Sequence, residues 1–208
     1  MRRLRFASIL LILSSSVSLF AADGAAGRPY LALGDSVSFG FITNAGFEYV
    51  NPENFIGFPD YVGHALKLHT SNAACPGETS GSFLSSTAPD DGCRFYRSQV
   101  PLHVSHTSTQ LDFAVSFLKS HPDTRLVSIG LGANDVLLFR TQCADDPTCI
   151  ARGLPQVLAV VETNLATILG DLRAAGFKGA EMVVDLGSIK VALWADGRHS
   201  STMRAVSG

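Results

Sequence analysis

The stretch Tyr30–Gly40, with the sequence YLALGDSVSFG, decides the fold because an apolar run leads directly into a polar turn that contains glycine. A short apolar run bounded in this way is typical of a buried strand. Gly34 tolerates backbone conformations that other residues resist, and Ser36 follows just past the strand end. A serine placed there can act as a nucleophile, but the same Gly-Asp-Ser turn also suits the start of an ordinary helix.

Two further polar motifs that contain glycine follow candidate strands. A weak candidate, Leu68–Ala74, precedes Cys75–Ser80 (CPGETS), and the clearest buried strand, Arg125–Leu131, precedes Gly132–Asp135 (GAND). Strands separated by helices predict a parallel sheet with helices on its faces. Ligands of such folds bind beyond the carboxyl ends of the strands, so the sequence predicts a site where the three motifs meet.

Helical patterns and loops fill the rest of the chain. We expect a short helix after Pro59, a helix from Thr109 that stops at His121, an amphipathic helix over Leu154–Leu172 and a further strand from Met182. Residues 41–58 and 81–108 are expected to be loops because they are rich in Gly, Pro, Ser, Asn and Asp. The first loop is aromatic, and its rings either line a pocket for an acyl chain or pack onto the core.

Composition favours one exported globular domain. The chain has 208 residues, of which 46% are hydrophobic and 16% charged, and its formal net charge is −2, which argues against nucleic acid as a partner. Residues 1–22 resemble a secretory signal, with arginines, a short apolar core and small residues, and cleavage up to residue 26 is compatible with the pattern. We expect residues 27–208 to form the domain, secreted or periplasmic and monomeric, with no stable membrane span after signal removal.

The cysteines indicate two disulfides. Cys75, Cys93, Cys143 and Cys149 form an even set in a chain expected to reach an oxidising compartment. Three pairings are possible, and we favour Cys75 with Cys93 and Cys143 with Cys149 because each pair brackets a local loop. Zinc binding is the alternative, but the sequence contains no C-x-x-C pair.

In their order along the chain, Gly34–Val37 (GDSV), Pro76–Ser80 (PGETS) and Gly132–Asp135 (GAND) resemble the first three sequence blocks of the GDSL or SGNH hydrolase family. The resemblance covers about residues 30–184, with Val37 in place of the usual leucine. It implies a three-layer α/β/α fold around a flavodoxin-like parallel sheet. The stretch after Gly34 lacks the second glycine of a G-x-S-x-G elbow, which argues against an ordinary α/β-hydrolase.

Residue by residue, the resemblance implies that Ser36 is the nucleophile. It also implies an oxyanion hole formed by the backbone N–H groups of Ser36 and Gly77 and the side-chain amide of Asn134. Fixed N–H donors of this kind stabilise the negative charge that develops on an ester oxygen in the transition state. Asp35 and Asp135 are interpreted as turn and network residues.

The family keeps its acid and base near the C-terminus as a D-x-x-H block, and Asp196-Gly197-Arg198-His199 fits that formula. The match arrives early in the chain and lacks the proline that usually follows. Two interpretations stay open. Either a compact variant brings Asp196 and His199 to Ser36, or the chain has lost its native C-terminus, with the last strand and helix of the family, after about residue 185.

These observations predict an exported serine hydrolase that cleaves small-molecule or lipid carboxylic esters through an acyl-serine intermediate, without a metal or organic cofactor. The alternatives are a catalytically incomplete SGNH-like domain that at most binds a ligand, and a carbohydrate O-acetyl esterase.

Overall fold

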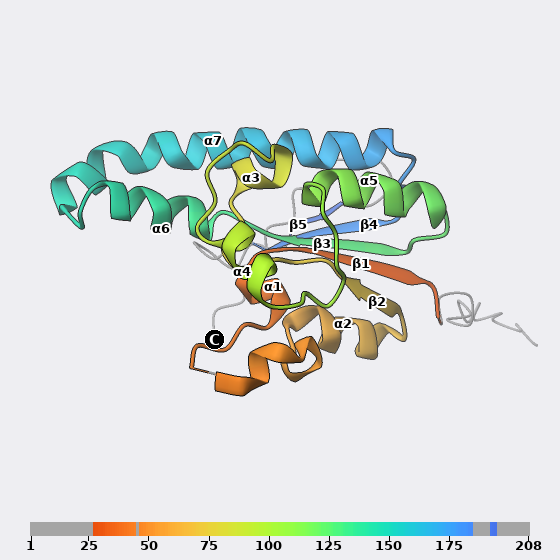
Figure 1. Cartoon of the computed structure of the whole chain (residues 1–208). Coiled ribbons are helices and arrows are strands. Elements are labelled where there is room, and N and C mark those ends of the chain that lie inside the picture. The colour runs from red at the N-terminus through yellow and green to blue at the C-terminus, as the bar shows by residue number, and fades with distance from the viewer. Residues whose placement is uncertain (1–26, 45, 185–191, 195–208) are drawn as a thin grey trace, which may run out of the picture.

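The computed structural model describes residues 27–44, 46–184 and 192–194, and within them the protein is a mixed α/β fold built on one sheet (Figure 1). The strand order is β2-β1-β3-β4-β5. The first four strands in this order pair in parallel, and β5 pairs antiparallel with β4. The bounds of the strands are β1 Pro29–Gly34, β2 His69–Asn72, β3 Leu126–Gly130, β4 Ala180–Val184 and β5 Ala192–Trp194.

Helices cover both faces of the sheet. The described helices are α1 Ser36–Phe39, α2 Phe58–Leu66, α3 Ser80–Leu84, α4 Cys93–Gln99, α5 Gln110–Ser120, α6 Ala133–Gln142 and α7 Pro147–Ala174, with 3₁₀ turns at Gly46–Val50 and Pro52–Asn54. Figure 1 shows α3, α5 and α7 on one side of the sheet and α2 on the other. The predicted parallel sheet between helical layers is therefore confirmed for β1 to β4.

Alternation along β1 explains the two layers. Leu31 and Leu33 belong to the main core, in which Ile168 and Leu172 of α7 are also fully buried. Tyr30 and Ala32 face the other way and pack in a second cluster with Val62 of α2 and neighbouring residues. Because successive side chains of a strand point to opposite faces, an unbroken apolar run is what a strand covered on both sides requires.

The helix predicted from Thr109 to His121 is confirmed, since Thr109 caps α5 and His121 ends it. The long helix begins earlier than predicted. Asp146 caps α7 by accepting a hydrogen bond from Thr148 N at 3.0 Å, and Pro155 lies inside the helix. By length and composition α7 could also cross a membrane. Its C-terminal half packs instead on the sheet through Ile168 and Leu172.

The loop predicted over residues 81–108 contains two short helices, α3 and α4. Thr79 starts α3 by accepting from Ser82 N, and Gly92 precedes α4 in the left-handed region, with φ of 109°. The Thr79 cap stabilises α3 and Gly92 permits the turn into α4, in a stretch whose Ser- and Pro-rich composition predicts no helix. The loop prediction was wrong for these two segments.

Both favoured disulfides are present. Cys75 pairs with Cys93 and Cys143 with Cys149, which is typical of extracellular proteins. The expected signal at residues 1–22, with cleavage up to residue 26, lies outside the described residues, as does the stretch after about residue 185 apart from β5.

Candidate active site

The three predicted motifs meet at the carboxyl edge of the sheet, where β2, β1 and β3 end side by side. Asp35 N donates to Gly130 O at 2.9 Å, and Cys75 N donates to Gly34 O at 2.9 Å. The turns that carry Ser36 and Gly77 are thus tied to the strand ends by backbone hydrogen bonds. The sequence prediction that this edge gathers the three polar motifs is confirmed.

Ser36 is the first residue of α1 and is partly exposed. The preceding Gly34 has φ of 126°, and a Cβ there would lie 2.1 Å from Gly130 O, so only glycine allows this turn. Asp35 caps α1 by accepting from Val37 N at 3.0 Å. Among the residues that the structure describes, neither the hydroxyl nor the backbone N–H of Ser36 makes a hydrogen bond.

Gly77 follows the disulfide-bonded Cys75 and has φ of 85°. A Cβ at this position would lie 2.4 Å from the backbone oxygen of Asp91. The Gly77 carbonyl accepts from Asp91 N at 2.8 Å, while its own N–H donates to no residue in the described part of the chain. The turn therefore needs glycine on steric grounds, and it leaves one backbone donor for a ligand.

Asn134 lies in the first turn of α6, after Gly132 in the left-handed region. It is 5% exposed, and its Nδ2 donates to Glu78 O at 2.8 Å. An amide nitrogen carries two protons, and within 27–44, 46–184 and 192–194 this is the one hydrogen bond that Nδ2 makes. The bond joins the third motif to the second and leaves the other Nδ2 proton without a partner in the described structure.

The two aspartates hold the turns. Asp135 accepts from Ser80 N at 2.9 Å and from Ser80 Oγ at 2.7 Å, and Asn164 of α7 donates to the same hydroxyl at 2.9 Å. Asp35 is 1% exposed and its Oδ2 has no partner in the described structure. Burial raises the pKa of Asp35 to about 6.

The sequence did not single out Gln110, although it connects the motifs. It is fully buried at the start of α5, where its Oε1 accepts from Gly34 N at 2.9 Å. Its Nε2 donates to Gly34 O at 2.8 Å and to Glu78 Oε2 at 2.6 Å. Gln110 occupies the same helical face as Ala114 and Leu118, and a glutamine on that apolar face is the signal that could have found it.

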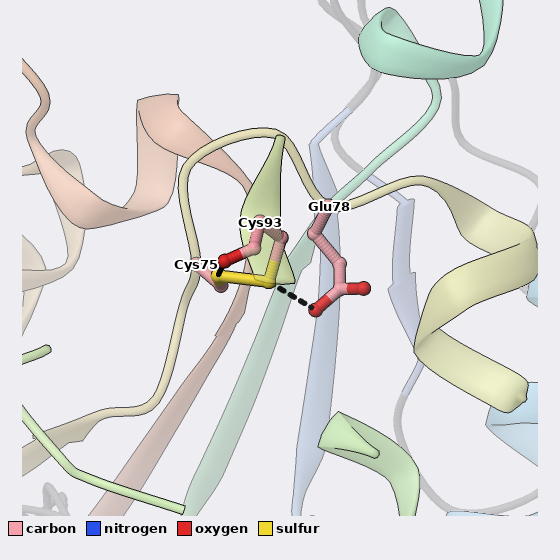
Figure 2. Close-up of side chains that lie close together, drawn as sticks. All are labelled: Cys75, Glu78 and Cys93. Atoms are coloured by element: carbon pink, nitrogen blue, oxygen red, sulfur yellow. Dashed lines mark hydrogen bonds between the residues drawn. A yellow bond between two sulfur atoms is a disulfide. The ribbon is translucent and has the colours of Figure 1, made fainter. Parts of the chain in front are cut away.

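Glu78 is buried beside the Cys75–Cys93 disulfide, as Figure 2 shows. Ser82 Oγ donates to Oε1, and Oε2 lies 3.5 Å from Cys93 Sγ. Burial raises the pKa of this carboxyl. A disulfide sulfur has no proton to donate, so the approach of Oε2 to Cys93 Sγ is a packing contact.

The same three residues, Cys75, Glu78 and Cys93, offer atoms that lie within 4.8 Å of one another, a spacing that could hold a metal ion (Figure 2). Cysteine ligates metals as the thiolate, and both sulfurs are committed to the disulfide. This cluster therefore links the Cys75 turn to the start of α4 and does not provide metal ligands.

The aromatic side chains after Ser36 pack mainly on one another. Phe39 and Phe55 are almost fully buried, and their rings lie 5.4 Å apart. Phe41, Tyr49 and Tyr96 join them in a cluster that also contains the Cys75–Cys93 disulfide. Of the two interpretations of this loop, packing onto the core is therefore the one that describes these rings.

A groove of about 340 Å³ lies between α6, α7 and the loop before α4. Leu138, Phe139 and Val160 give it apolar walls, and Asp135 and Thr79 place one end beside the second and third motifs. Ser36 does not line it.

None of the described histidines forms a hydrogen bond with Ser36. His103 Nε2 lies 3.0 Å from Phe39 O, and His106 engages the backbone oxygens of Ser108 and Ala73. The predicted acid and base, Asp196 and His199, lie outside the described residues. The described chain thus contains the predicted nucleophile and oxyanion donors but not the predicted base.

A scan against protein-family profiles gave no match, and a search of curated proteins gave no significant match.

Proposed function

We propose that this protein is an exported serine hydrolase of the SGNH type that cleaves carboxylic esters through an acyl-serine intermediate. The observation that carries the proposal is the meeting of Ser36, Gly77 and Asn134 on adjacent loops at one edge of the sheet, joined through Gly34 and Glu78. Each keeps an N–H or O–H that makes no hydrogen bond in the described chain and that ester hydrolysis needs.

In the proposed reaction, Ser36 Oγ attacks the ester carbonyl and passes its proton to a histidine, for which His199 is the candidate and Asp196 its orienting carboxylate. The N–H groups of Ser36 and Gly77 and the Asn134 amide stabilise the negative oxygen of the tetrahedral intermediate. The C–O bond to the alcohol then breaks and the histidine returns the proton to the leaving alcohol. Water attacks the acyl-serine by the same route and regenerates the enzyme.

The substrate is proposed only at the level of an ester. Because the aromatic rings behind Ser36 are packed together, they give no support to a deep acyl pocket in that loop. Short soluble esters, lipid esters and acetylated sugars are all consistent with the site as described.

The test is hydrolysis of short p-nitrophenyl esters by the purified full chain, with Ser36→Ala and His199→Ala as variants. Loss of an oxyanion or nucleophile group lowers kcat by roughly 10² or more, so both variants should be inactive within detection. Ser86→Ala and His64→Ala change exposed residues and serve as matched controls.

The outcomes separate the alternatives. Activity that survives His199→Ala but not Ser36→Ala would assign the base elsewhere. A folded wild-type chain that hydrolyses neither p-nitrophenyl acetate, p-nitrophenyl octanoate nor acetylated xylose would support the incomplete, ligand-binding domain.

A further inference from the structure

The Gln110 side-chain amide has one orientation that satisfies all three of its hydrogen bonds. Gly34 N–H donates a hydrogen bond to Gln110 Oε1, whereas Gly34 O and the Glu78 carboxyl each accept a hydrogen bond from Gln110 Nε2. An amide nitrogen carries two protons, so the donor capacity of Gln110 is fully used, and its oxygen accepts from Gly34 N. A carboxylate at the same position could accept from Gly34 N but would have no proton for the other two partners.

The partners of Gln110 are next to the reactive groups. Gly34 is two residues before Ser36, and Glu78 directly follows Gly77. The Glu78 carbonyl accepts from the Asn134 amide, so a shift of Glu78 moves the second and third motifs together. One buried side chain thereby fixes the spacing between the nucleophile turn and both other oxyanion donors.

The surroundings of the pair are closed. Gln110 is fully buried and Glu78 is 3% exposed, so water does not replace a lost bond cheaply. The Cys75–Cys93 disulfide and Ser82 contact the Glu78 carboxyl on its other sides. Arg97 of α4 and Asp90 of the loop before it are the charged groups that act on this carboxyl, Arg97 favouring its ionised form and Asp90 opposing it.

We propose that Gln110 and Glu78 form a positioning pair that sets the distance between Ser36 and the oxyanion donors of Gly77 and Asn134. The proposal rests on the proposed esterase function. Neither residue contacts the reacting atoms. Their bonds act on the backbone at Gly34 and Glu78, so they control how well the donors meet the transition state rather than how well the substrate binds.

The first variant is Gln110→Ala. Displacement of catalytic groups by about 1 Å costs roughly 100-fold in rate, so kcat should fall by about tenfold to 100-fold while KM changes little. Gln99→Ala on α4 removes a glutamine from an exposed position and is the matched control.

The second variant, Gln110→Glu, tests the pH profile of kcat, which would not change if Gln110 had a purely structural role. It places two carboxyls in contact, and such a pair shares one proton until the pH rises to the point at which both ionise and repel each other. The kcat of this variant should therefore fall with rising pH, over a pH range in which the kcat of the wild type stays constant. The exchanged pair Glu78→Gln/Gln110→Glu restores a donor opposite the new carboxyl and should remove that decline.

The kinetic results distinguish failure of the positioning role from failure of the esterase function. If Gln110→Ala and Gln110→Glu keep wild-type kcat and pH profile, the positioning role is wrong while the esterase function stands. If the wild-type chain hydrolyses no ester, both proposals fail. Should Gln110→Ala not fold, the comparison of Gln110→Glu with the exchanged pair decides, because both keep the acceptor for Gly34 N. Recovery in the exchanged pair supports the role, and equal profiles overturn it.

Discussion

The two disulfides stabilise regions that are built in opposite ways. Cys75–Cys93 is almost fully buried, spans 18 residues and touches the Glu78 carboxyl at the centre of the candidate site. Cys143–Cys149 spans 6 residues in the turn between α6 and α7, which extend past the end of the sheet in Figure 1. The site region buries the linked side chains of Glu78 and Gln110, whereas the α6–α7 end leaves Leu137, Leu158 and Val160 exposed. Similar covalent links therefore stabilise a buried candidate site in one place and a helix–helix connection in the other.

Removal of each disulfide is the strongest test of that contrast. From loop length alone, Cys75→Ala/Cys93→Ala should lower the free energy of unfolding by about 3 kcal/mol and Cys143→Ala/Cys149→Ala by about 2 kcal/mol. The rate of ester hydrolysis should differ more between the two variants, because only the Cys75–Cys93 disulfide contacts Glu78. Chemical denaturation and kcat at a temperature where both variants are folded measure the two effects. Equal losses of kcat would show that the site does not depend on its disulfide.

Asp35→Asn should change stability in a pH-dependent way. Because the folded-state pKa of Asp35 is raised to about 6, the wild type is favoured below pH 4 and loses stability as pH rises through about 6. An amide keeps the cap at Val37 N without the charge, so the variant should gain about 2 to 3 kcal/mol over the wild type above pH 7.

Thermal unfolding across pH 4 to 8 checks this expectation. Asp146→Asn is the matched control in the other region, since Asp146 caps α7 from an exposed position. A constant difference between Asp35→Asn and the wild type over this range would contradict the assignment.

Gly77→Ala should destabilise the protein by about 2 kcal/mol, because its Cβ would overlap a backbone oxygen at a positive φ. The shift needed to relieve the overlap should also lower kcat. Gly176→Ala at the end of α7 has a similar φ, of 97°, but open space around it, so it should cost about 1 kcal/mol and leave kcat unchanged. Identical unfolding curves for the two variants would rule out the steric argument.

Leu158→Gln on the exposed face of α7 should have the smallest effect, within about 0.5 kcal/mol by denaturation. Leu172→Gln, on the buried half of the same helix, provides the contrast and should cost several-fold more. A large loss for Leu158→Gln would indicate that this face is covered in solution.

The elements that the sequence could predict are those with local signals. The strands β1 and β3 and the turns after them were identifiable because their apolar runs and glycines are local signals. The helices α3 and α4 were not, because both are too short to show periodicity: α3 begins at the Thr79 cap and α4 begins at the disulfide-bonded Cys93. Gln110 bonds to Gly34, 76 residues away, and no local pattern records such a partner.

Of the two strands at the edges of the described sheet, β2 and β5, β2 has the polar sequence HTSN. Edge strands offer unpaired backbone groups to other molecules, and long apolar edges invite aggregation. This strand is short and polar, so it presents a poor template for the strand of a second chain. At this edge the fully apolar strand β1 is therefore covered by a strand that offers other chains little apolar surface.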